Sequence, residues 1–519
     1  MQELYSDFLA RLADSYNRQP YFSNVFPWSA PGYLRAAAHL YGLDTPPVAN
    51  ARILELGCAA GGNCIPVASL YPQAEVVGVD ISPAQIAMGR RVIDALGLTN
   101  IRLLDQCFST LPADLGRFDY IIAHGVWSWV PEFAQEALLA VCRRHLKVDG
   151  AVYLSYNTYP GWKLQEVFRE GMLFHGQQFS DVDEIARARE MLPFFLHGLA
   201  EDNPMRSVLA AQAKSIPEGA ENDYYIAHEY LELHNQPIYL QDFIRRLTPY
   251  GLRHLGDVEV RNEFPQRYGK AFAQHFGLFV QGQQGQVRQQ YLDFAVGRQF
   301  RKSLLVRDEF GAQAGEPDLR RLRDLLFAGW FECVSEAKNV DDQAVVRFYR
   351  SLQQEELRIA HPVHMSWMDY VHECWPRPVS GRDLIRLAVA QYPELNKEQA
   401  LAELQDWYLT VPLMVSRSYE DLPPCLQDLY EGLIPGIGPL LAVRSEQSIG
   451  ISDFNAWFQS STAPFSTIEH QIVQGLAARQ SLDDIARSLV AAGQMADDAQ
   501  AHQKVDALVA NLRKYAMYV

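Results

Sequence analysis

Between residues 51 and 156, short apolar segments alternate with segments of helical length, and this alternation restricts the folds open to the chain. Parallel strands need a long crossover connection, usually a helix, whereas antiparallel strands need only a turn. The alternation therefore predicts βαβ units and a mostly parallel sheet with helices on its faces. The expected strands are 51–56, 75–80, 100–105, 118–123 and 150–156, and the expected helices are 63–70, 83–96 and 131–146.

The pattern changes after residue 162. The stretch 163–247 is expected to be helical, and two β-like segments, 252–260 and 300–308, are expected to complete the sheet. Helical patterns return beyond about 315 and cover 319–330, 381–390, 397–409 and 466–492. The expected fold class is α/β, with a Rossmann-like, mostly parallel, seven-stranded sheet, a helical insertion and a mainly helical C-terminal domain in which a winged-helix-like arrangement is one option. The expected domains are an N-terminal helical lid (1–45), a nucleotide-binding core (46–162), a helical insertion (163–250), the end of the sheet (251–312) and a C-terminal interaction domain (316–519).

The stretch 53–63, ILELGCAAGGN, leads from the first expected strand into a turn of small residues. A dinucleotide fingerprint, G-x-G-x-x-G, would place glycine at 57, 59 and 62, but residue 59 is alanine. Because the middle glycine lets the backbone approach a pyrophosphate, the methyl group of Ala59 disfavours NAD. The pattern acid-x-Gly-x-small-x-Gly fits instead, with Glu55, Gly57, Ala59 and Gly61. This pattern suits a ligand that carries an ammonium group and no phosphate, such as S-adenosylmethionine (SAM).

Acidic residues also end the next two expected strands. Asp80 follows the loop by about 20 residues, where an acid can accept hydrogen bonds from ribose hydroxyls. Asp105 can accept from an adenine amine, and Phe108 can face the ring. The alternative is that the glycines only allow close packing of strand and helix, and it leaves the series of acids unexplained. The predicted cofactor-binding residues are Glu55, Gly57, Cys58, Ala59, Gly61, Asn63, Asp80, Ile81, Asp105, Gln106, Cys107 and His124.

Two aromatic loops, 125–131 and 156–159, follow the fourth and fifth expected strands. In methyl transfer the positive charge moves from sulfur to the acceptor, and aromatic faces stabilise such cations. A lysine acceptor has a pKa near 10.4, so its deprotonation at pH 7 costs roughly 4–5 kcal/mol. Desolvation lowers that pKa, and positioning alone can then drive the reaction. Asn157 is expected to hold the amine, and His124 is the nearest candidate base. The predicted catalytic residues are Trp127, Trp129, Tyr156, Asn157, Tyr159 and His124, although the aromatic ones have an alternative role in packing the sheet against the N-terminal helices.

Several segments together resemble a known family. Region 51–156, with its series of acids and glycines, resembles the class I SAM-dependent methyltransferases. Four further segments are similar to bacterial methyltransferases that carry a methyltransferase regulatory domain: PYFS (20–23), YNTYPGW (156–162), HEYLE (228–232) and RQFRKSLL (298–305). Among such enzymes, the rickettsial protein lysine methyltransferases modify outer-membrane proteins and have a middle dimerisation region and a C-terminal domain. The resemblance covers about residues 1–310. It implies SAM as cofactor, a regulatory role for the helical insertion and, as one option, a homodimer, but it does not extend to the substrate.

Charge and composition disfavour several other classes. The net charge of −16 and the pI of about 5.4 disfavour nucleic acid, whose phosphates require clustered lysine and arginine. No apolar run is long enough to span a membrane, and the N-terminus lacks the basic region of a secretory signal. Seven scattered cysteines without a repeated C-x-x-C spacing are typical of the reducing cytoplasm. One conceivable metal set, H-x2-H-x7-H-x-C at His361, His364, His372 and Cys374, is interpreted as a packed turn, so no metal is expected.

The leading function predicted is therefore SAM-dependent methyl transfer to a protein side chain, with lysine first. A small-molecule methyltransferase is the second hypothesis; a sealed cavity of a few hundred cubic ångströms would favour it, whereas a wide cleft would favour a protein acceptor. The third hypothesis is a scaffold or regulatory protein without turnover, and NAD-dependent chemistry is the fourth. Residues 316–519 are expected to recruit the protein substrate or to contact a second copy of the chain.

Overall fold

The computed structural model of the chain describes residues 12–14, 16–17, 20–179, 183–197, 199–214, 216, 223–338, 345–411, 416–419, 422–427, 431–446, 450–460 and 465–519. Residues 1–11, 15, 18 and 19 of the expected N-terminal lid lie outside the described residues. The same holds for short stretches of the expected insertion and of the expected C-terminal domain.

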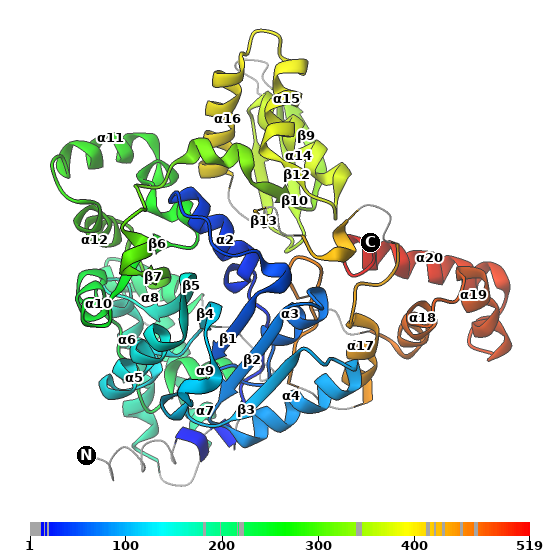
Figure 1. Cartoon of the computed structure of the whole chain (residues 1–519), viewed down its shortest axis with the longest axis horizontal. Helices are drawn as coiled ribbons and strands as arrows, with labels where there is room; N and C mark the ends of the chain where they lie inside the picture. Colours follow the sequence, from blue (N-terminus) through cyan, green and yellow to red (C-terminus); the bar gives the residue numbers. More distant parts are fainter. Residues whose placement is uncertain are drawn as a thin grey trace.

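Seven strands form the central sheet of the fold (Figure 1). In chain order they are β1 (Arg52–Leu56), β2 (Glu75–Asp80), β3 (Ile101–Asp105), β4 (Phe118–Ala123), β5 (Leu146–Asn157), β6 (Leu252–Asp257) and β7 (Phe300–Arg307). They lie in the order β3-β2-β1-β4-β5-β7-β6. Strands β1 to β5 are parallel to one another, whereas β7 runs antiparallel to both β5 and β6. The expected mostly parallel, seven-stranded sheet is confirmed. Its strand order reverses between β1 and β4, where sheets of this type bind ligands beyond the carboxyl ends of the strands.

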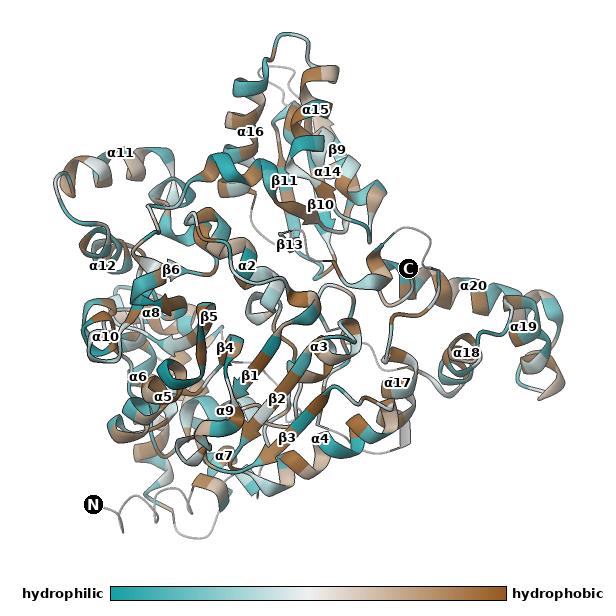
Figure 2. Cartoon of the chain, in the orientation of Figure 1, coloured by the Kyte–Doolittle hydropathy of each residue, from teal (hydrophilic) through white to brown (hydrophobic). Residues whose placement is uncertain are grey.

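Helices cover both faces of the sheet because successive residues of a strand point to opposite sides. Ile53 packs into the hydrophobic core on one face, and its neighbour Leu54 packs into a separate core on the other. Figure 2 shows β1, β2 and β3 largely in the brown of hydrophobic residues. The first core includes the helices α2 (Pro31–Leu40), α3 (Cys64–Leu70) and α4 (Pro83–Leu96), and the second includes α5 (Glu132–His145) and α10 (Leu240–Leu247).

The helical insertion lies between β5 and β6 and has a small core of its own. Its helices are α6 (Trp162–Gly176), α7 (Glu184–Leu196), α8 (Pro204–Ala213) and α9 (Asp223–Tyr230), followed by α10. Phe168, Met172 and Ile226 are fully buried in this core. Two more helices, α11 (Lys270–Phe279) and α12 (Gly285–Val296), connect β6 to β7. The insertion therefore leaves the sheet at the end of β5 and returns to it, which brings α9 back beside the strand ends.

The C-terminal region contains two small sheets as well as helices. Strands β9 (Phe331–Lys338), β10 (Val345–Ser351) and β11 (Glu356–Ile359) form an antiparallel sheet, and β8 (Leu326–Ala328) pairs with β12 (Val379–Ser380) and β13 (Ser416–Ser418). The helices are α14 (Pro362–Cys374), α15 (Gly381–Gln391), α16 (Lys397–Thr410), α17 (Ile437–Glu446), α18 (Thr467–Ala477), α19 (Leu482–Ala491) and α20 (Asp498–Lys514). In Figure 1, α14 to α16 form a lobe at the top, and α18 to α20 extend to the right.

Two local expectations are corrected. The segment 319–330 is not one helix, because a 3-10 turn, Leu319–Asp324, gives way to β8, where Phe327 is buried against Trp407. The segment 466–492 is two helices, α18 and α19. The chain turns between them at Arg479, which has a left-handed backbone (φ +56), and Ser481 caps the second helix. Tertiary pairing and capping override the helical pattern at these points.

The C-terminal region returns to the nucleotide-binding half of the fold. Helix α17 packs against α4. Ser23, in the N-terminal segment, donates its amide to the carbonyl of Gly450 (2.7 Å) and accepts from the amide of Ser452 (3.0 Å). The Ser452 hydroxyl also accepts from the amide of Val25 (3.1 Å). The N-terminal segment is therefore held by residues more than 400 positions away in the chain.

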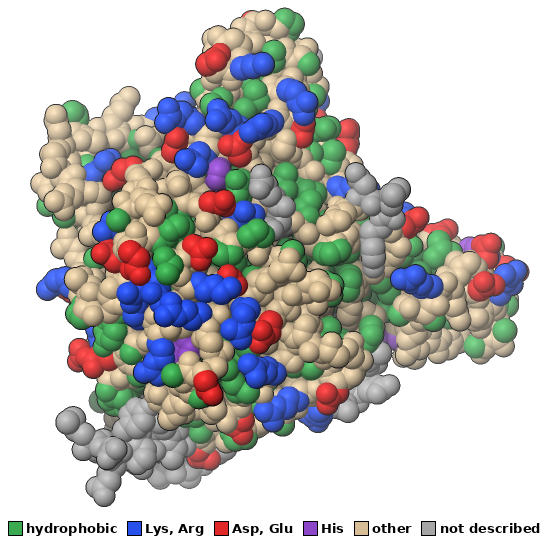
Figure 3. All heavy atoms as spheres, viewed as in Figure 1, with side chains coloured by type: hydrophobic (Ala, Val, Ile, Leu, Met, Phe, Trp, Pro, Cys, Tyr) green, Lys and Arg blue, Asp and Glu red, His purple; other side chains and the backbone are tan. Residues whose placement is uncertain are grey.

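The described surface mixes charges of both signs. On the face shown in Figure 3, lysine and arginine side chains lie among aspartate and glutamate side chains. Ion pairs such as Arg52 with Glu75 (2.8 Å) and Arg143 with Glu309 (3.1 Å) are examples of this mixing. Of the helices in the described ranges, none has both the length and the apolar character needed to cross a membrane.

Candidate functional site

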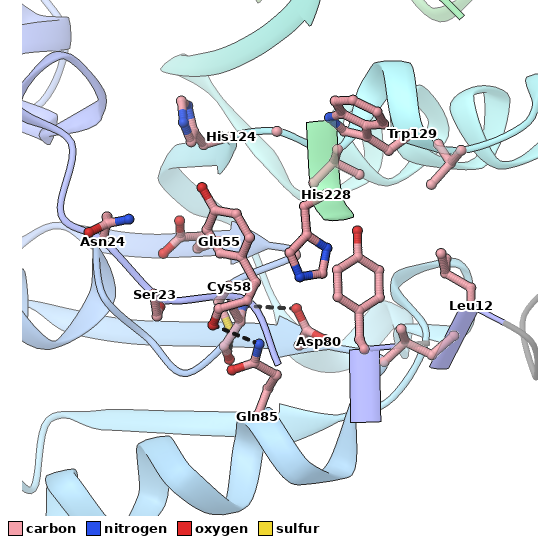
Figure 4. Close-up of a pocket in the computed structure, with 18 of the residues that line it drawn as sticks. Leu12, Ser23, Asn24, Glu55, Cys58, Asp80, Gln85, His124, Trp129 and His228 are labelled. Carbon is pink, nitrogen blue, oxygen red and sulfur yellow. Dashed lines mark hydrogen bonds between the residues drawn. The ribbon is translucent and has the colours of Figure 1, made fainter. Parts of the chain in front are cut away.

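A cavity of about 380 Å³ lies beyond the carboxyl ends of β1, β2, β4 and β5 (Figure 4). Its base is the glycine loop that follows β1, together with the residues that end the neighbouring strands. The elements outside the parallel part of the sheet that cover it include helix α9 and the N-terminal segment with Ser23, Asn24 and Phe26. The cavity is where the reversal of strand order predicts a ligand.

The glycine loop is held open by unusual backbone conformations. Gly57 (φ +75), Ala59 (φ +48) and Gly61 (φ +88) all adopt positive φ angles. A side chain at Gly57 would collide with Val126, since an added Cβ would lie 2.5 Å from its Cγ2. Ala59 pays a conformational cost in this region, which a hydrogen bond from its amide to Asp80 Oδ2 (2.8 Å) offsets. Strand β2 thus fixes the loop that follows β1.

Two backbone amides donate hydrogen bonds to the carboxylate of Asp80. Its carboxylate accepts from the amides of Ala59 (2.8 Å) and Ser82 (2.9 Å) and lies in the cavity wall. Burial, and to a smaller extent the charge of Asp105, raises the pKa of Asp80. The two amide bonds orient the carboxylate, so its remaining lone pairs are available to hydroxyl donors in the cavity.

Glu55 is buried at the end of β1 and connects the loop to α3. It accepts from Asn63 Nδ2 (2.9 Å) and from the thiol of Cys64 (2.8 Å). Burial raises the pKa of Glu55 to about 7. Asn63 in turn accepts from the amide of Phe26 (2.8 Å), and the amide of Gly62 donates to the Ser23 hydroxyl (2.8 Å). The acid, the loop and the N-terminal segment are therefore one hydrogen-bonded unit.

Most of the predicted cofactor residues lie in the cavity wall, and two do not. Those in the wall are Glu55, Gly57, Cys58, Ala59, Asn63, Asp80, Ile81, Gln106, Cys107 and His124. Asp105 is exposed at the end of β3 and lies outside the wall, and its expected place beside an adenine stays a prediction. Gly61 also lies outside the wall, and a Cβ added there would contact Leu103 and Ile65. Phe108, expected to face the ring, does line the cavity.

Of the residues predicted to be catalytic in the two loops, some lie in the cavity wall and others lie outside it. Trp129 and Asn157 lie in the wall, whereas Trp127, Tyr156 and Tyr159 lie outside it. Trp127 and Tyr156 are fully buried on the other side of the sheet end, where both pack on Phe243 of α10.

Tyr159 lies away from the cavity against α6. Its hydroxyl donates to Glu166, and its ring lies beside Tyr239. Like Trp127 and Tyr156, it has the packing role that the sequence left open as an alternative.

His124 is a neutral side chain in the wall. Its Nδ1 lies 2.9 Å from the Tyr153 hydroxyl and 3.2 Å from the Ser155 hydroxyl, and its ring packs on Phe26 with a centroid distance of 3.9 Å. Burial, with a smaller effect from the charge of Lys302, lowers the pKa of His124 to about 3. Such an imidazole is a weak base, so its geometry favours orientation and shape over proton abstraction.

Hydrogen bonds fix Asn157 and engage the amino group of its side chain. Its backbone amide donates to the Ser128 hydroxyl (2.9 Å), and its side-chain Nδ2 donates to Asn235 Oδ1 (3.2 Å). With the amino group held in this way, Oδ1 is the atom of this side chain that is left to accept a hydrogen bond in the cavity.

Helix α9 brings polar side chains that the sequence analysis did not assign to the site. His228 stacks on Tyr16 (5.4 Å between centroids) and reaches toward Asp80 and Glu55 in Figure 4. Its Nδ1 lies 2.9 Å from Glu232, while its Nε2 is buried without a hydrogen-bond partner among the described residues. Glu229, also in the wall, has its pKa raised to about 7 by burial first and by the charge of Glu232 second. The only sequence signal for these residues was the resemblance of the segment 228–232.

Acidic residues dominate the electrostatics of the cavity wall. Its carboxylates are Glu55, Asp80 and Glu229, and the described residues that line it include no lysine or arginine. Tyr16, Tyr21 and other aromatic rings surround them. Gln106 Nε2 and Gln85 Oε1 are buried and lack hydrogen-bond partners within the described part of the chain. Acids, rings and free amide groups in one cavity suit a cationic ligand with a nucleoside part better than a phosphate.

Comparison with known proteins agrees with this geometry. The family model described as "Methyltransferase domain" matches residues 53–150, and the one described as "Predicted methyltransferase regulatory domain" matches residues 222–307. The protein named "Uncharacterized protein RP789" of Rickettsia prowazekii (strain Madrid E) is 36% identical over 297 residues, which cover 57% of this chain and 53% of that protein. "Uncharacterized protein RP028" of the same organism is 36% identical over 234 residues, which cover 45% of this chain and 93% of that protein.

Among solved structures, PKMT2 from Rickettsia typhi in complex with AdoHcy has the same fold. Its TM-score is 0.77 at 24% identity, and the alignment covers 96% of this chain and 100% of that one. The shared fold therefore includes the insertion and the C-terminal region as well as the sheet.

Proposed function

This chain belongs to the class I SAM-dependent methyltransferases that carry a methyltransferase regulatory domain, and from that premise we propose that it methylates a protein side chain, with lysine as the favoured acceptor. The observation that carries the proposal is the cavity wall, which combines three carboxylates and several aromatic rings with no lysine or arginine among its described residues. Such a wall attracts cations, and both the cofactor and a lysine side chain are cationic in water.

The residues present fit SAM. The loop after β1 would hold the amino acid part beside Glu55, Asp80 would accept from the ribose hydroxyls, and Gln106 and Phe108 would contact the adenine. Bound SAM supplies a methyl group on a positively charged sulfur. His228, with its unpartnered Nε2, and Tyr16 would cover the cofactor from α9 and the N-terminal segment.

The acceptor would enter beside the ends of β4 and β5. Asn157 Oδ1 would accept a hydrogen bond from the acceptor amine, and Trp129 and Phe26 would exclude water around it. Burial away from water lowers the pKa of an amine, so the cavity itself favours the neutral form that attacks. Glu229 would attract the protonated side chain before it loses its proton. With His124 a weak base, positioning in place of proton abstraction would supply most of the rate.

A second candidate is a small-molecule methyltransferase. The cavity volume of about 380 Å³ favours it, because this is the range of pockets that enclose small ligands. The acceptor would then be a small amine, since the acidic wall attracts a cationic acceptor of either kind. The two candidates differ in the acceptor, while the cofactor site is common to both.

The experiment that separates them is a transfer assay with radiolabelled SAM and a whole-cell lysate of the source organism. We expect label in the protein fraction that is lost with the Asn157→Ala variant. Label confined to the metabolite fraction would contradict the protein acceptor and favour the second candidate. The absence of label from both fractions, with SAM binding intact, would favour a regulatory protein without turnover.

The protein acceptor also gives a role to the C-terminal region. We propose that residues 316–519 recruit the protein substrate or contact a second copy of the chain in a homodimer. Nucleic acid is not a proposed partner, given the net charge of −16. The free thiols of the described cysteines accord with a cytoplasmic location, which is part of the same proposal.

A further inference from the structure

Two histidines and a glutamate meet in the lobe formed by α14 and α16, far from the cavity. His361 precedes α14, His364 lies in its first turn, and Glu403 lies on α16. One ligand atom from each side chain lies within 4.8 Å of the other two. We call these three side chains the His–His–Glu cluster. In Figure 1 the two helices stand together in the upper lobe.

Two of the three distances within the His–His–Glu cluster, those from Glu403 to the histidines, match the edges of a metal coordination shell. Glu403 Oε2 lies 3.4 Å from His364 Nε2 and 3.5 Å from His361 Nε2. Around tetrahedral zinc, with bonds of about 2.0–2.2 Å to nitrogen and oxygen, neighbouring ligand atoms are about 3.3–3.5 Å apart. The same separations are long for hydrogen bonds between these groups.

Ordinary side-chain pairing does not account for His364. Its side chain is 5% exposed, and its Nε2 is buried without a hydrogen-bond partner among the described residues. Its ring stacks on Trp367 (5.8 Å, 18° between planes), which holds the nitrogen toward Glu403. An imidazole nitrogen without a hydrogen-bond partner that faces a carboxylate oxygen is stabilised when a cation lies between them.

We propose that His361, His364 and Glu403 bind one divalent transition-metal cation of the zinc class. Two imidazoles and one carboxylate are a known zinc ligand set, and water would take the fourth position on the side of His361, which is 46% exposed. The cation joins the start of α14 to the middle of α16, so it stabilises the packing of the C-terminal lobe. The site is independent of methyl transfer and of the acceptor.

The set differs from the one considered from the sequence. His372 and Cys374 do not join it, because His372 Nδ1 accepts from the amide of Phe331 (3.2 Å) and its ring packs on Trp330. Glu403 lies on another helix, 39 positions after His364, so spacing within one segment could not identify it. The expectation that the chain binds no metal is replaced by this proposal.

The test uses the full-length protein, stripped with a chelator and then dialysed against zinc chloride and metal-free buffer. We expect about one more zinc per chain, by mass spectrometry of the metal, than the His361→Ala and Glu403→Gln variants retain. His470→Ala, which removes a histidine of α18 remote from the His–His–Glu cluster, should match the wild type. Both test variants change exposed or partly exposed side chains, and circular dichroism checks that they are folded.

Two further readouts keep the test independent of the seven cysteines. Cobalt should give the visible absorption of a tetrahedral site without a sulfur-to-metal charge-transfer band, and this absorption should be absent in His361→Ala. Zinc should raise the Tm of the wild type and of His470→Ala, but not that of Glu403→Gln. Equal zinc retention by wild type and His361→Ala, or a cobalt spectrum of thiolate ligation that all variants share, would overturn the proposal.

Discussion

Replacing Glu229 by glutamine removes a buried carboxylate whose charged form destabilises the folded protein. Burial raises the pKa of this carboxyl from 4.5 to about 7, with a smaller contribution from Glu232. Because the pKa in the folded protein lies above that in the unfolded chain, folding favours the protonated form. Stability is therefore lost as the pH rises from about 4.5 through about 7, and the full loss is present above that window. At about 1.4 kcal/mol per pKa unit, the penalty above pH 8 is roughly 3 kcal/mol.

Glutamine keeps the shape of the side chain and carries no charge, so the variant should escape this penalty. We expect Glu229→Gln to be more stable than the wild type by about 2–3 kcal/mol at pH 8.5 and nearly equal to it at pH 4.5. With a urea m-value of about 3 kcal/mol per M, the difference at pH 8.5 is a shift of roughly 1 M in the unfolding midpoint, followed by tryptophan fluorescence. Glu136→Gln, on the exposed face of α5, is the matched control. It should leave the urea unfolding midpoint unchanged at both pH 8.5 and pH 4.5.

The same substitution should reduce function. If Glu229 attracts the cationic acceptor, the variant should lose about tenfold in kcat/KM for methyl transfer, or about 1.4 kcal/mol. A gain in stability combined with a loss of activity is typical of a charge retained for its function. Equal urea midpoints for variant and wild type at pH 8.5 would refute the reasoning, because they would show that the carboxylate has no energetic conflict with its surroundings.

Other substitutions test the remaining parts of the site. Asp80→Ala should weaken SAM binding by at least about 30-fold, roughly 2 kcal/mol, in a calorimetric titration, since it removes the acceptor of the Ala59 amide as well as a ligand contact. Asn157→Ala should lower kcat about tenfold with the Kd for SAM unchanged within about twofold, whereas Tyr159→Phe should change neither value, because its hydroxyl bonds to α6 outside the cavity. Ser452→Ala should weaken SAM binding about three- to tenfold, since it leaves the buried amide of Val25 without its acceptor. The affinity for SAM should rise as the pH increases through about 7, because Glu55 becomes a carboxylate there; equal Kd values at pH 6 and pH 8 would contradict this.

The parts of the site that lie within one stretch of chain were predictable from the sequence. The strand, the glycine loop and the following helix are adjacent in sequence, so the spacing of Glu55, Gly57 and Asp80 directly reports their positions. The alternation of short apolar segments with segments of helical length likewise predicted the sheet, because central strands that are buried on both faces are continuous apolar runs in the sequence. The side-chain direction of Asp105 was not predictable in this way, since the last residue of a strand can face either way.

The covering elements were not predictable by local reasoning. Ser23 and His228 reach the cavity from outside the parallel part of the sheet, and no periodicity connects them to the glycine loop. Trp127 and Trp129 belong to the same 3-10 turn, yet one is fully buried behind the loop and the other lines the cavity. In so short a turn, the contact with Phe243 decides which ring faces inward.

The contact of the C-terminal region with the N-terminal segment is a further feature that the sequence did not indicate. Ser452 holds the segment whose Ser23 hydroxyl accepts from the glycine loop. The region beyond residue 316 therefore supports the cofactor site through hydrogen bonds as well as any role in recruitment. Its deletion would disturb both functions together, which is why a single substitution is the better test.

The central claim is that an amine of a protein receives the methyl group in this cavity. Mass spectrometric mapping of lysate proteins after incubation with the purified chain and isotopically labelled SAM tests it most directly. We expect labelled methyl groups on lysine side chains, present with the wild type and with Tyr159→Phe and depleted about tenfold with Asn157→Ala. Label on carboxylate, amide or hydroxyl side chains, or labelled lysines in equal amount with Asn157→Ala, would contradict it.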